Sequence, residues 1–280
     1  MKTDLLLIPM SARWSQMRAA ALAAEEAGFD GLWTWDHLRD PDGDSETGVP
    51  EALTVLAAMA EVTRRVTLGP LVLNVSNRHP GLLANMAATI QQVSQGRFML
   101  GVGAGGHRRL PYAAELEMLG LEIAPDAVRA QRVAEASEVL RRLWRGDGTD
   151  FTGTYYQLHR ASGYLRPDPP PPIIVGGFGP RMAAIAGRHA DGFNTQARHP
   201  NLATLLETAR QEYRATGRDP LRFVTTVFAG MEPRWLRADA GERAALEDLG
   251  VDRLVLLLSP PFDPSEIRAA GRALSASTRS

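Results

Sequence analysis

The amino-acid sequence predicts an α/β protein with a single (β/α)8 TIM-barrel domain over residues 1–280. First, apolar runs of strand length alternate with longer segments in which apolar residues have helical spacing. Second, eight such strand–helix repeats fit the length of the chain. Third, polar or glycine-rich residues recur directly after the strands, at the edge where barrel active sites are built. An open, doubly wound sheet is the alternative architecture for the same alternation.

The first four repeats are regular. Apolar runs predict strands at residues 4–9, 31–35, 66–73 and 98–104. Helical spacing predicts helices at 14–27, 51–63 and 82–93, the first of which ends at Gly28. We expect the third helix to bury a face made of Leu82, Leu83, Met86, Ile90 and Val93.

The second half departs from this rhythm. Residues 108–125 form a long loop or insertion after the fourth strand, and residues 151–165 predict a small β-hairpin before the fifth strand. The remaining strands are expected at 173–175, 193–196, 223–229 and 253–258. The remaining helices are expected at 133–144, 180–190, 202–213, 235–249 and 264–274.

The fifth strand leads into a loop rich in glycine. Its β-branched run, which is expected to be buried on both faces, ends at Gly176 and Gly177. Gly179 then precedes Pro180, which fits the first turn of a helix because its missing N–H is not needed there. Free N–H groups at a helix N-terminus, together with Arg181, would attract an anion. The simpler alternative is a tight turn in which the glycines only relieve backbone strain.

Composition excludes several classes of function. The formal net charge is -1, so neither nucleic acid nor an acidic membrane is an expected partner, and no apolar run approaches transmembrane length. Zero cysteines exclude disulfides and fit a cytoplasmic protein. No metal is expected, because the His, Asp and Glu residues lack metal-ligand spacing. A cofactor-free phosphate-binding lyase has little support, since Lys2 is the only lysine available for a Schiff base.

Four segments of the chain share a pattern. They are AGFDGLWTWDH (27–37), NRHP (77–80), GRFMLGVGAG (96–105) and GGFGPRMAAIAGRHADGFN (176–194). In this order, and spanning nearly the whole chain, they resemble the luciferase-like monooxygenase family, in particular its coenzyme F420-dependent branch. The resemblance implies a barrel with a flavin or deazaflavin at the mouth formed by the C-terminal ends of the strands.

That resemblance also implies where the cofactor lies. Its phosphate would be held by Gly176, Gly177, Gly179, Pro180 and Arg181, which favours the anion site over the simple turn. Gly105 and Gly106 would let the cofactor approach the fourth strand. The end of the third strand would lie behind the tricyclic ring and contain a cis peptide bond; its residues are Leu71, Val72, Leu73 and Asn74. Arg78 would either contact the cofactor or pair with a carboxylate.

The resemblance further implies a reaction. Asp36 and His37 match the pair that faces the ring in F420-dependent relatives, and an imidazole can transfer a proton near neutral pH. Both are therefore expected to be catalytic, although an isolated Asp-His pair more often caps local backbone donors. Some sugar-phosphate dehydrogenases of the family carry a glutamate soon after the fourth strand, where this chain has Gly106 and His107.

We therefore expect an oxidoreductase that transfers a hydride between coenzyme F420 and a small organic substrate. One alternative is an FMN-dependent monooxygenase that uses O2 and reduced flavin from a separate reductase. A second is a flavin-binding protein without catalytic activity. Relatives are commonly dimers, so a homodimer is expected, and an F420 or flavin reductase is the expected protein partner.

Overall fold

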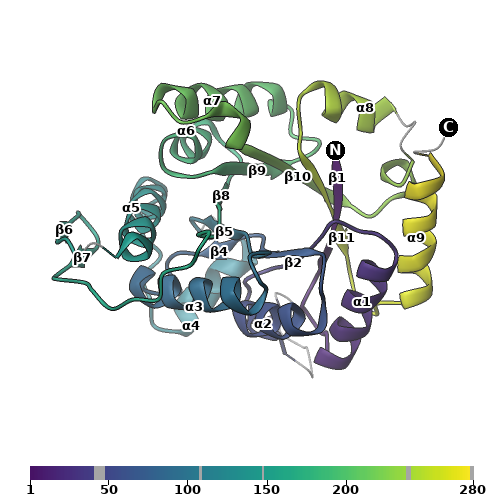
Figure 1. The fold of residues 1–280 in the computed structure, drawn as a ribbon, viewed down its shortest axis with the longest axis horizontal. Coiled ribbons are helices and arrows are strands. Elements are labelled where there is room, and N and C mark those ends of the chain that lie inside the picture. The colour runs from purple at the N-terminus through teal and green to yellow at the C-terminus, as the bar shows by residue number, and fades with distance from the viewer. Residues whose placement is uncertain (41–47, 107–108, 147, 238–240, 278–280) are drawn as a thin grey trace.

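A computed structural model of the chain describes residues 1–40, 48–106, 109–146, 148–237 and 241–277. Across these residues, one sheet of nine strands lies inside a ring of helices (Figure 1). The strand order is β3-β2-β1-β11-β10-β9-β8-β5-β4, and a parallel bridge from Leu68 to Phe98 joins the β3 end to the β5 end. Because β3 and β4 together occupy one position, the sheet closes as a (β/α)8-type barrel, and the predicted fold is confirmed.

All pairings in this sheet are parallel. The strands are β1 (Lys2–Leu7), β2 (Gly31–Thr34), β3 (Thr67–Pro70), β4 (Leu73–Asn74), β5 (Leu100–Gly103), β8 (Ile173–Gly176), β9 (Gly192–Gln196), β10 (Val224–Gly230) and β11 (Arg253–Leu258). The predicted hairpin is also present, as the short antiparallel pair β6 (Phe151–Thr152) and β7 (Gln157–Leu158).

Helices connect the strands and cover the outside of the sheet. They are α1 (Trp14–Glu26), α2 (Ala52–Val62), α3 (Pro80–Val93), α4 (Ala114–Met118), α5 (Asp126–Arg145), α6 (Pro180–His189), α7 (Leu202–Ala215), α8 (Gly241–Asp248) and α9 (Pro264–Ser277). Short 3-10 turns are η1 (Pro111–Ala113), η2 (Pro220–Arg222) and η3 (Pro233–Trp235). The insertion after β5 therefore contains η1 and α4.

Three details differ from the sequence-based expectation. The single strand predicted at 66–73 is divided into β3 and β4. The cis peptide bond expected in this region is present, between Leu71 and Val72. The single helix predicted at 235–249 is wrong: Pro233 opens η3, and Gly241 opens a separate helix, α8. The predicted buried face of α3 is partly wrong, because Leu82 is 59% exposed and Val93 is 39% exposed.

Side chains on successive strand residues alternate between two cores. One core fills the inside of the barrel and contains Leu6, Trp33, Leu71, Met99, Ile174 and Val255. The other lies between the sheet and the helices, and takes alternate residues of the same strands, such as Leu5, Leu32 and Val175. Because apolar side chains fill the barrel, a ligand must bind at its mouth.

A buried ion pair lies inside the barrel near the amino ends of the strands. Arg253 on β11 donates two hydrogen bonds to Asp4 on β1, at 2.7 Å and 2.8 Å. The indole N–H of Trp33 on β2 donates a third hydrogen bond to Asp4, at 2.8 Å. The two charged side chains are 0% and 5% exposed, so this network joins three neighbouring strands out of contact with water.

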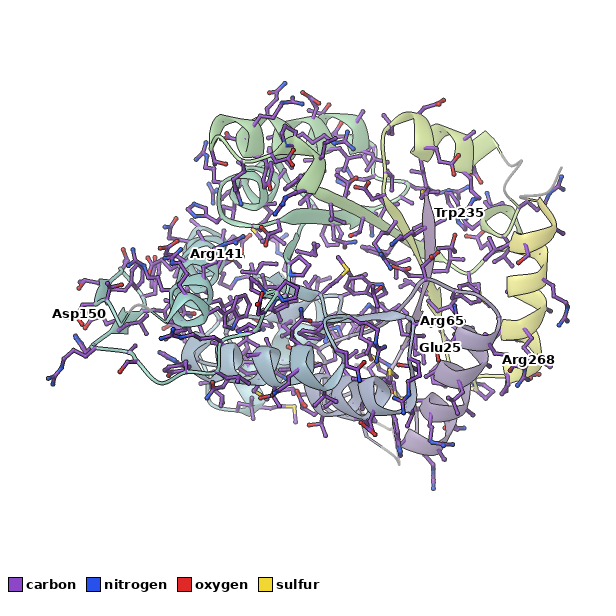
Figure 2. All side chains as sticks on the ribbon, in the orientation of Figure 1. Glu25, Arg65, Arg141, Asp150, Trp235 and Arg268 are labelled. Carbon is purple, nitrogen blue, oxygen red and sulfur yellow. The ribbon has the colours of Figure 1, made fainter. Side chains whose placement is uncertain are left out.

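Glu25 at the end of α1 holds the turn that leads into β3 (Figure 2). Its carboxylate accepts hydrogen bonds from the backbone N–H groups of Arg64, Arg65 and Val66, at 2.6 to 3.1 Å. Burial alone would raise the pKa of Glu25, but these N–H groups stabilise the ionised form and hold the pKa below its ordinary value of 4.5.

Replacing Glu25 with glutamine is expected to destabilise the protein at neutral pH. A lowered carboxylate pKa contributes stability that is present above pH 4.5 and is lost as the pH falls through the folded-state pKa. The difference in melting temperature between the wild type and Glu25→Gln should therefore shrink as the pH falls below 4.5. Glu26→Gln is the matched control, since Glu26 only pairs with Arg268 on the surface. A pH-independent difference for Glu25→Gln would contradict the assignment.

Candidate active site

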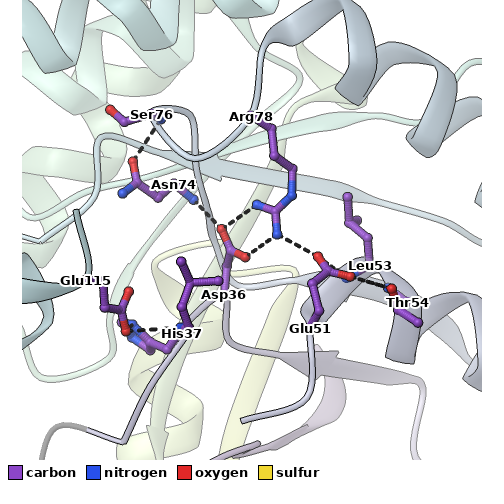
Figure 3. Close-up of polar contacts among 10 residues, drawn as sticks. Asp36, His37, Glu51, Leu53, Thr54, Asn74, Ser76, Arg78 and Glu115 are labelled. Atoms are coloured by element: carbon purple, nitrogen blue, oxygen red, sulfur yellow. Dashed lines mark hydrogen bonds and ion pairs between the residues drawn. The ribbon is translucent and has the colours of Figure 1, made fainter. Parts of the chain in front are cut away.

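Polar side chains gather at the mouth of the barrel, beyond the C-terminal ends of β2 and β4. Asp36 and His37 follow β2, and Asn74 ends β4 (Figure 3). Arg78 follows in the loop before α3, and Glu115 comes from α4 in the insertion. Figure 3 shows two groups: Arg78 lies between Asp36 and Glu51, and His37 faces Glu115.

The ring of His37 is held from three sides. Its Nδ1 lies 3.1 Å from the carboxylate of Glu115. The ring of Tyr112 stacks on it with the centroids 3.9 Å apart, and Trp35 meets it edge-on at 5.8 Å. A carboxylate oxygen accepts hydrogen bonds, so this contact assigns Nδ1 as the donor to Glu115 and leaves Nε2 as the other ring nitrogen. The side chain is 23% exposed, so a ligand at the mouth can reach it.

Glu115 itself is 5% exposed and accepts a second hydrogen bond, from the backbone N–H of Leu38 at 3.1 Å. The next residue of α4, Leu116, packs in a small cluster with Ala113 and Ile123. The insertion thus has a local core that fixes the carboxylate against His37. A carboxylate on Nδ1 sets the orientation and tautomer of the imidazole and stabilises its charged form.

Asp36, the residue before His37, is enclosed by other side chains and backbone. Its side chain is 1% exposed, and Arg78 donates to both of its oxygens, at 2.7 Å and 2.8 Å. The backbone N–H of Asn74 donates to the same carboxylate at 2.9 Å. Both oxygens of Asp36 are thus held by Arg78, and one also accepts from Asn74; the catalytic role expected for Asp36 stays a prediction.

Arg78 is therefore placed as an ion-pair partner. It also donates to Glu51, the N-cap residue of α2, at 2.6 Å. Burial alone would lower the pKa of Arg78, but its bonds to Asp36 and Glu51 outweigh burial and raise that pKa. The guanidinium stays charged and ties the end of β2 to the loop after β4 and to α2.

Two glycine loops lie side by side at the mouth. β5 and β8 are neighbouring strands, with Val102 paired to Val175, so the loops that follow them are adjacent. Gly103 and Gly176 both lie against Val72: a Cβ on Gly103 would come within 2.5 Å of a Val72 methyl, and one on Gly176 within 2.9 Å. Side chains here would displace Val72, so the two glycines provide the room that the Val72 side chain occupies.

The loop after β8 leads into α6 as expected. Gly179 is the N-cap, Pro180 is in the first turn, and Arg181 is exposed with no ion-pair partner among the residues that the structure describes. A Cβ on Gly179 would meet no atom within 4 Å. The N–H of Gly177, however, is bonded to the carbonyl of Asn194 at 3.0 Å, and a Cβ on Gly177 would lie 2.3 Å from the Cβ of Met182, so Gly177 offers no donor and is needed for packing against α6.

The four residues expected behind the ring do not share one environment. Val72 lies at the mouth, beside the two strand-end glycines. Leu71 belongs to the core inside the barrel, whereas Leu73 is 1% exposed and packs outward toward the helices, where it cannot touch a ligand. The side chain of Asn74 accepts a hydrogen bond from the N–H of Ser76 at 3.0 Å.

Sequence reasoning missed two residues of the site. Glu115 lies in the insertion, where no strand register predicts its position; the glutamate missing at Gly106 was the signal to look for a carboxylate nearby. Arg129 on α5 is 4% exposed and binds the carbonyl groups that follow β5. His107 and Arg108 lie outside the described residues.

In the described part of the chain, no three His, Cys, Asp or Glu side chains are grouped so that they could hold a metal ion. The helices that the structure describes include none with the length and apolar character needed to cross a membrane.

Comparison with known proteins shows the family of the chain and two relatives of named function. The model of the luciferase-like monooxygenase family matches residues 4–278. An F420-dependent glucose-6-phosphate dehydrogenase of Nakamurella multipartita is 37% identical over 209 residues, which cover 73% of this chain and 59% of that protein. An F420-dependent hydroxymycolic acid dehydrogenase of Mycobacterium tuberculosis is 35% identical over 209 residues, covering 74% of this chain and 56% of that protein. The chain thus spans less than two thirds of the length of either relative.

A solved structure has the same fold. The F420-dependent secondary alcohol dehydrogenase in complex with an F420-acetone adduct superposes with a TM-score of 0.80. Sequence identity is 22%, and the superposition covers 98% of this chain and 99% of that chain. At this identity the likeness concerns the barrel and not the ligands.

Proposed function

Because the chain belongs to the luciferase-like monooxygenase family, we propose that it is an oxidoreductase that uses coenzyme F420 to interconvert an alcohol and a carbonyl compound. The observation that carries the proposal is the His37–Glu115 pair at the mouth of the barrel, where the glycine loops that follow β5 and β8 are adjacent. The names of both curated relatives support it, since each describes an F420-dependent dehydrogenase.

The residues at the mouth suit a phosphate-bearing tricyclic cofactor. The N-terminus of α6 offers backbone donors at the positive end of a helix, Gly179 leaves space in front of them, and Arg181 adds a charge. Val72 would support the ring, because it lies between the strand-end glycines Gly103 and Gly176. When bound, F420 would supply the carbon atom that takes up or returns a hydride.

His37 would move the proton. An alcohol that loses a hydride from its carbon must also lose its hydroxyl proton, and Nε2 is the atom positioned to accept it, because Nδ1 is committed to Glu115. In the reverse direction the same nitrogen donates a proton to the carbonyl oxygen. Glu115 acts through His37 as a positioning residue, and Asp36 with Arg78 holds the loop from which His37 projects.

Equilibrium binding tests the proposal directly. The purified protein is titrated with F420 and, separately, with oxidised and reduced FMN, at matched salt. Binding of F420 in the micromolar range or tighter, with weaker FMN binding, supports the proposal. A preference for reduced FMN would overturn it in favour of a monooxygenase that uses O2 and a separate reductase. If none of the three ligands binds, the loop after β8 is a simple turn and not a cofactor site.

Replacing His37 with alanine is expected to lower kcat by about a hundredfold or more, because a positioned acid–base group contributes that much. The dissociation constant for F420 should stay within about threefold, since the imidazole has no place in the proposed phosphate site. Glu115→Gln should lower kcat by about tenfold, as the ring loses its charged partner. Glu117→Gln is the control, because Glu117 is exposed on the same helix. Unchanged turnover in His37→Ala would make His37 structural.

A further inference from the structure

We infer that Arg129 is a positioning residue that turns the loop after β5 into the second half of the anion site. This rests on the proposed binding of a phosphate-bearing cofactor. One guanidinium nitrogen, Nη1, donates to three successive carbonyl groups, those of Ala104, Gly105 and Gly106, at 2.7, 2.9 and 2.9 Å. Because three consecutive carbonyl groups accept hydrogen bonds from this one nitrogen, we infer that Arg129 sets the conformation of the loop.

The remaining donors of Arg129 anchor it to the start of its own helix. Nε donates to the carbonyl of Ala124 at 3.1 Å, and Nη2 donates to Asp126 at 2.8 Å. The arginine side chain is 5% exposed, whereas that of Asp126 is 62% exposed. The cation is therefore fixed behind the loop, on the side of α5, and its charge faces the carbonyl ends of the loop peptides.

The three carbonyl groups point toward Arg129, so the N–H groups of the same peptides point away from it. The N–H and C=O of a planar trans peptide point in opposite directions, so the N–H groups of Gly105 and Gly106 face away from α5. Gly105 has a φ of +74°. These two N–H groups lie on the face of the loop opposite Arg129, where backbone N–H groups of such turns can donate to an anion. A Cβ on Gly105 would lie 2.7 Å from the Asn74 amide, so only glycine fits.

These N–H groups lie next to the loop after β8. Since β5 and β8 are adjacent, Gly105 and Gly106 lie beside Gly177 and Gly179. An anion between the two loops would meet the N-terminus of α6 on one side and the amides turned by Arg129 on the other. Arg129 would not touch the anion; it would act through the backbone.

The test compares two ligands that differ in the phosphate. F420 carries a phosphate ester and the anionic chain beyond it, and its precursor 8-hydroxy-5-deazariboflavin has the same ring and ribityl chain without them. In Arg129→Met, which keeps the length of the side chain and removes the donors, affinity for F420 should fall by about tenfold or more, as expected for lost hydrogen bonding to an anion. Affinity for the precursor should change by less than about threefold.

Arg141→Met is the matched control. Arg141 lies on the same helix and pairs with Asp191 at 2.8 Å, at the opposite end of the strands (Figure 2). This variant should leave both affinities unchanged. Arg129→Lys keeps the charge but offers fewer donors, so its F420 affinity should lie between those of wild type and Arg129→Met; it also serves if the methionine variant fails to fold.

The outcomes separate this inference from the proposed function. If the wild-type protein fails to bind F420, the proposed function fails before Arg129 is considered. If the wild type binds F420 and the Arg129 variants lose affinity for both ligands equally, Arg129 only maintains the fold, and the inference is overturned. Unchanged affinity for both ligands would overturn it as well. Only a selective loss of F420 affinity supports the positioning role.

Discussion

Replacing Gly179 with aspartate is expected to abolish F420 binding without destabilising the barrel. Gly179 is the N-cap of α6 with a φ of −142°, an extended conformation that any residue adopts, and an added Cβ would meet no atom within 4 Å. Aspartate is a favoured N-cap residue, so the helix should be as stable as before or slightly more stable. Its carboxylate would occupy the helix donors and repel the phosphate.

The expected loss of affinity is at least about a hundredfold, because like charges about 4 Å apart in a partly shielded site repel by several kcal/mol. Fluorescence titration with F420 measures the loss, and thermal unfolding measures stability. Gly179→Asn has nearly the same shape without the charge and should bind F420 considerably better than Gly179→Asp. Equal losses in both variants would indicate a steric effect, and unchanged F420 binding in Gly179→Asp would place the phosphate elsewhere.

Arg253→Met is expected to cost about 3–5 kcal/mol of unfolding free energy, because it leaves the Asp4 carboxylate buried without its ionic partner. Asp4 is 0% exposed, and Trp33 would be left as its only side-chain donor among those described above. The loss should appear as a large fall in the urea midpoint with little change in slope. Since the pair joins β1 to β11, these first and last strands should separate early during unfolding of the variant.

A surface pair provides the comparison. Arg268 on α9 binds Glu26 on α1 at 2.9 Å, and the two side chains are 44% and 65% exposed (Figure 2). Arg268→Met should cost about 1 kcal/mol or less, because exposed ion pairs are screened by water. The double variant Asp4→Leu/Arg253→Met should recover part of the loss of Arg253→Met, since it removes the unpaired charge. A loss for Arg253→Met no larger than that for Arg268→Met would contradict this account.

The sequence predicts the barrel well because the residue patterns that mark its strands and helices lie within short segments of the chain. A strand such as β11 is a continuous apolar run, and its predicted bounds of 253–258 match the structure. The loop before α6 was likewise readable, since its glycines and Pro180 have positional meaning within a few residues. The predicted helix at 235–249 failed where local composition favours a helix and a buried Trp235 ends a 3-10 turn instead.

The partners of the site residues were not readable, because they join segments far apart in the chain. Glu115 lies 78 residues beyond His37, and Arg78 lies 42 residues beyond Asp36. Their side chains meet only because the ends of several strands converge at the mouth of the barrel. Nothing in the spacing of one sequence marks such a pair. The enclosure of Asp36 by Arg78 is likewise a property of the fold that local sequence does not reveal.

The separation between His37 and its partner bears on how this protein can change over evolution. His37 projects from the loop after β2, whereas Glu115 belongs to an insertion whose small cluster of Ala113, Leu116 and Ile123 is distinct from the two barrel cores. Residues 109–125 can therefore accumulate substitutions with little effect on the packing inside the barrel. For directed evolution, this segment is the place to build a library, because substitutions there can give the His37 imidazole a new partner without changing the packing of the barrel.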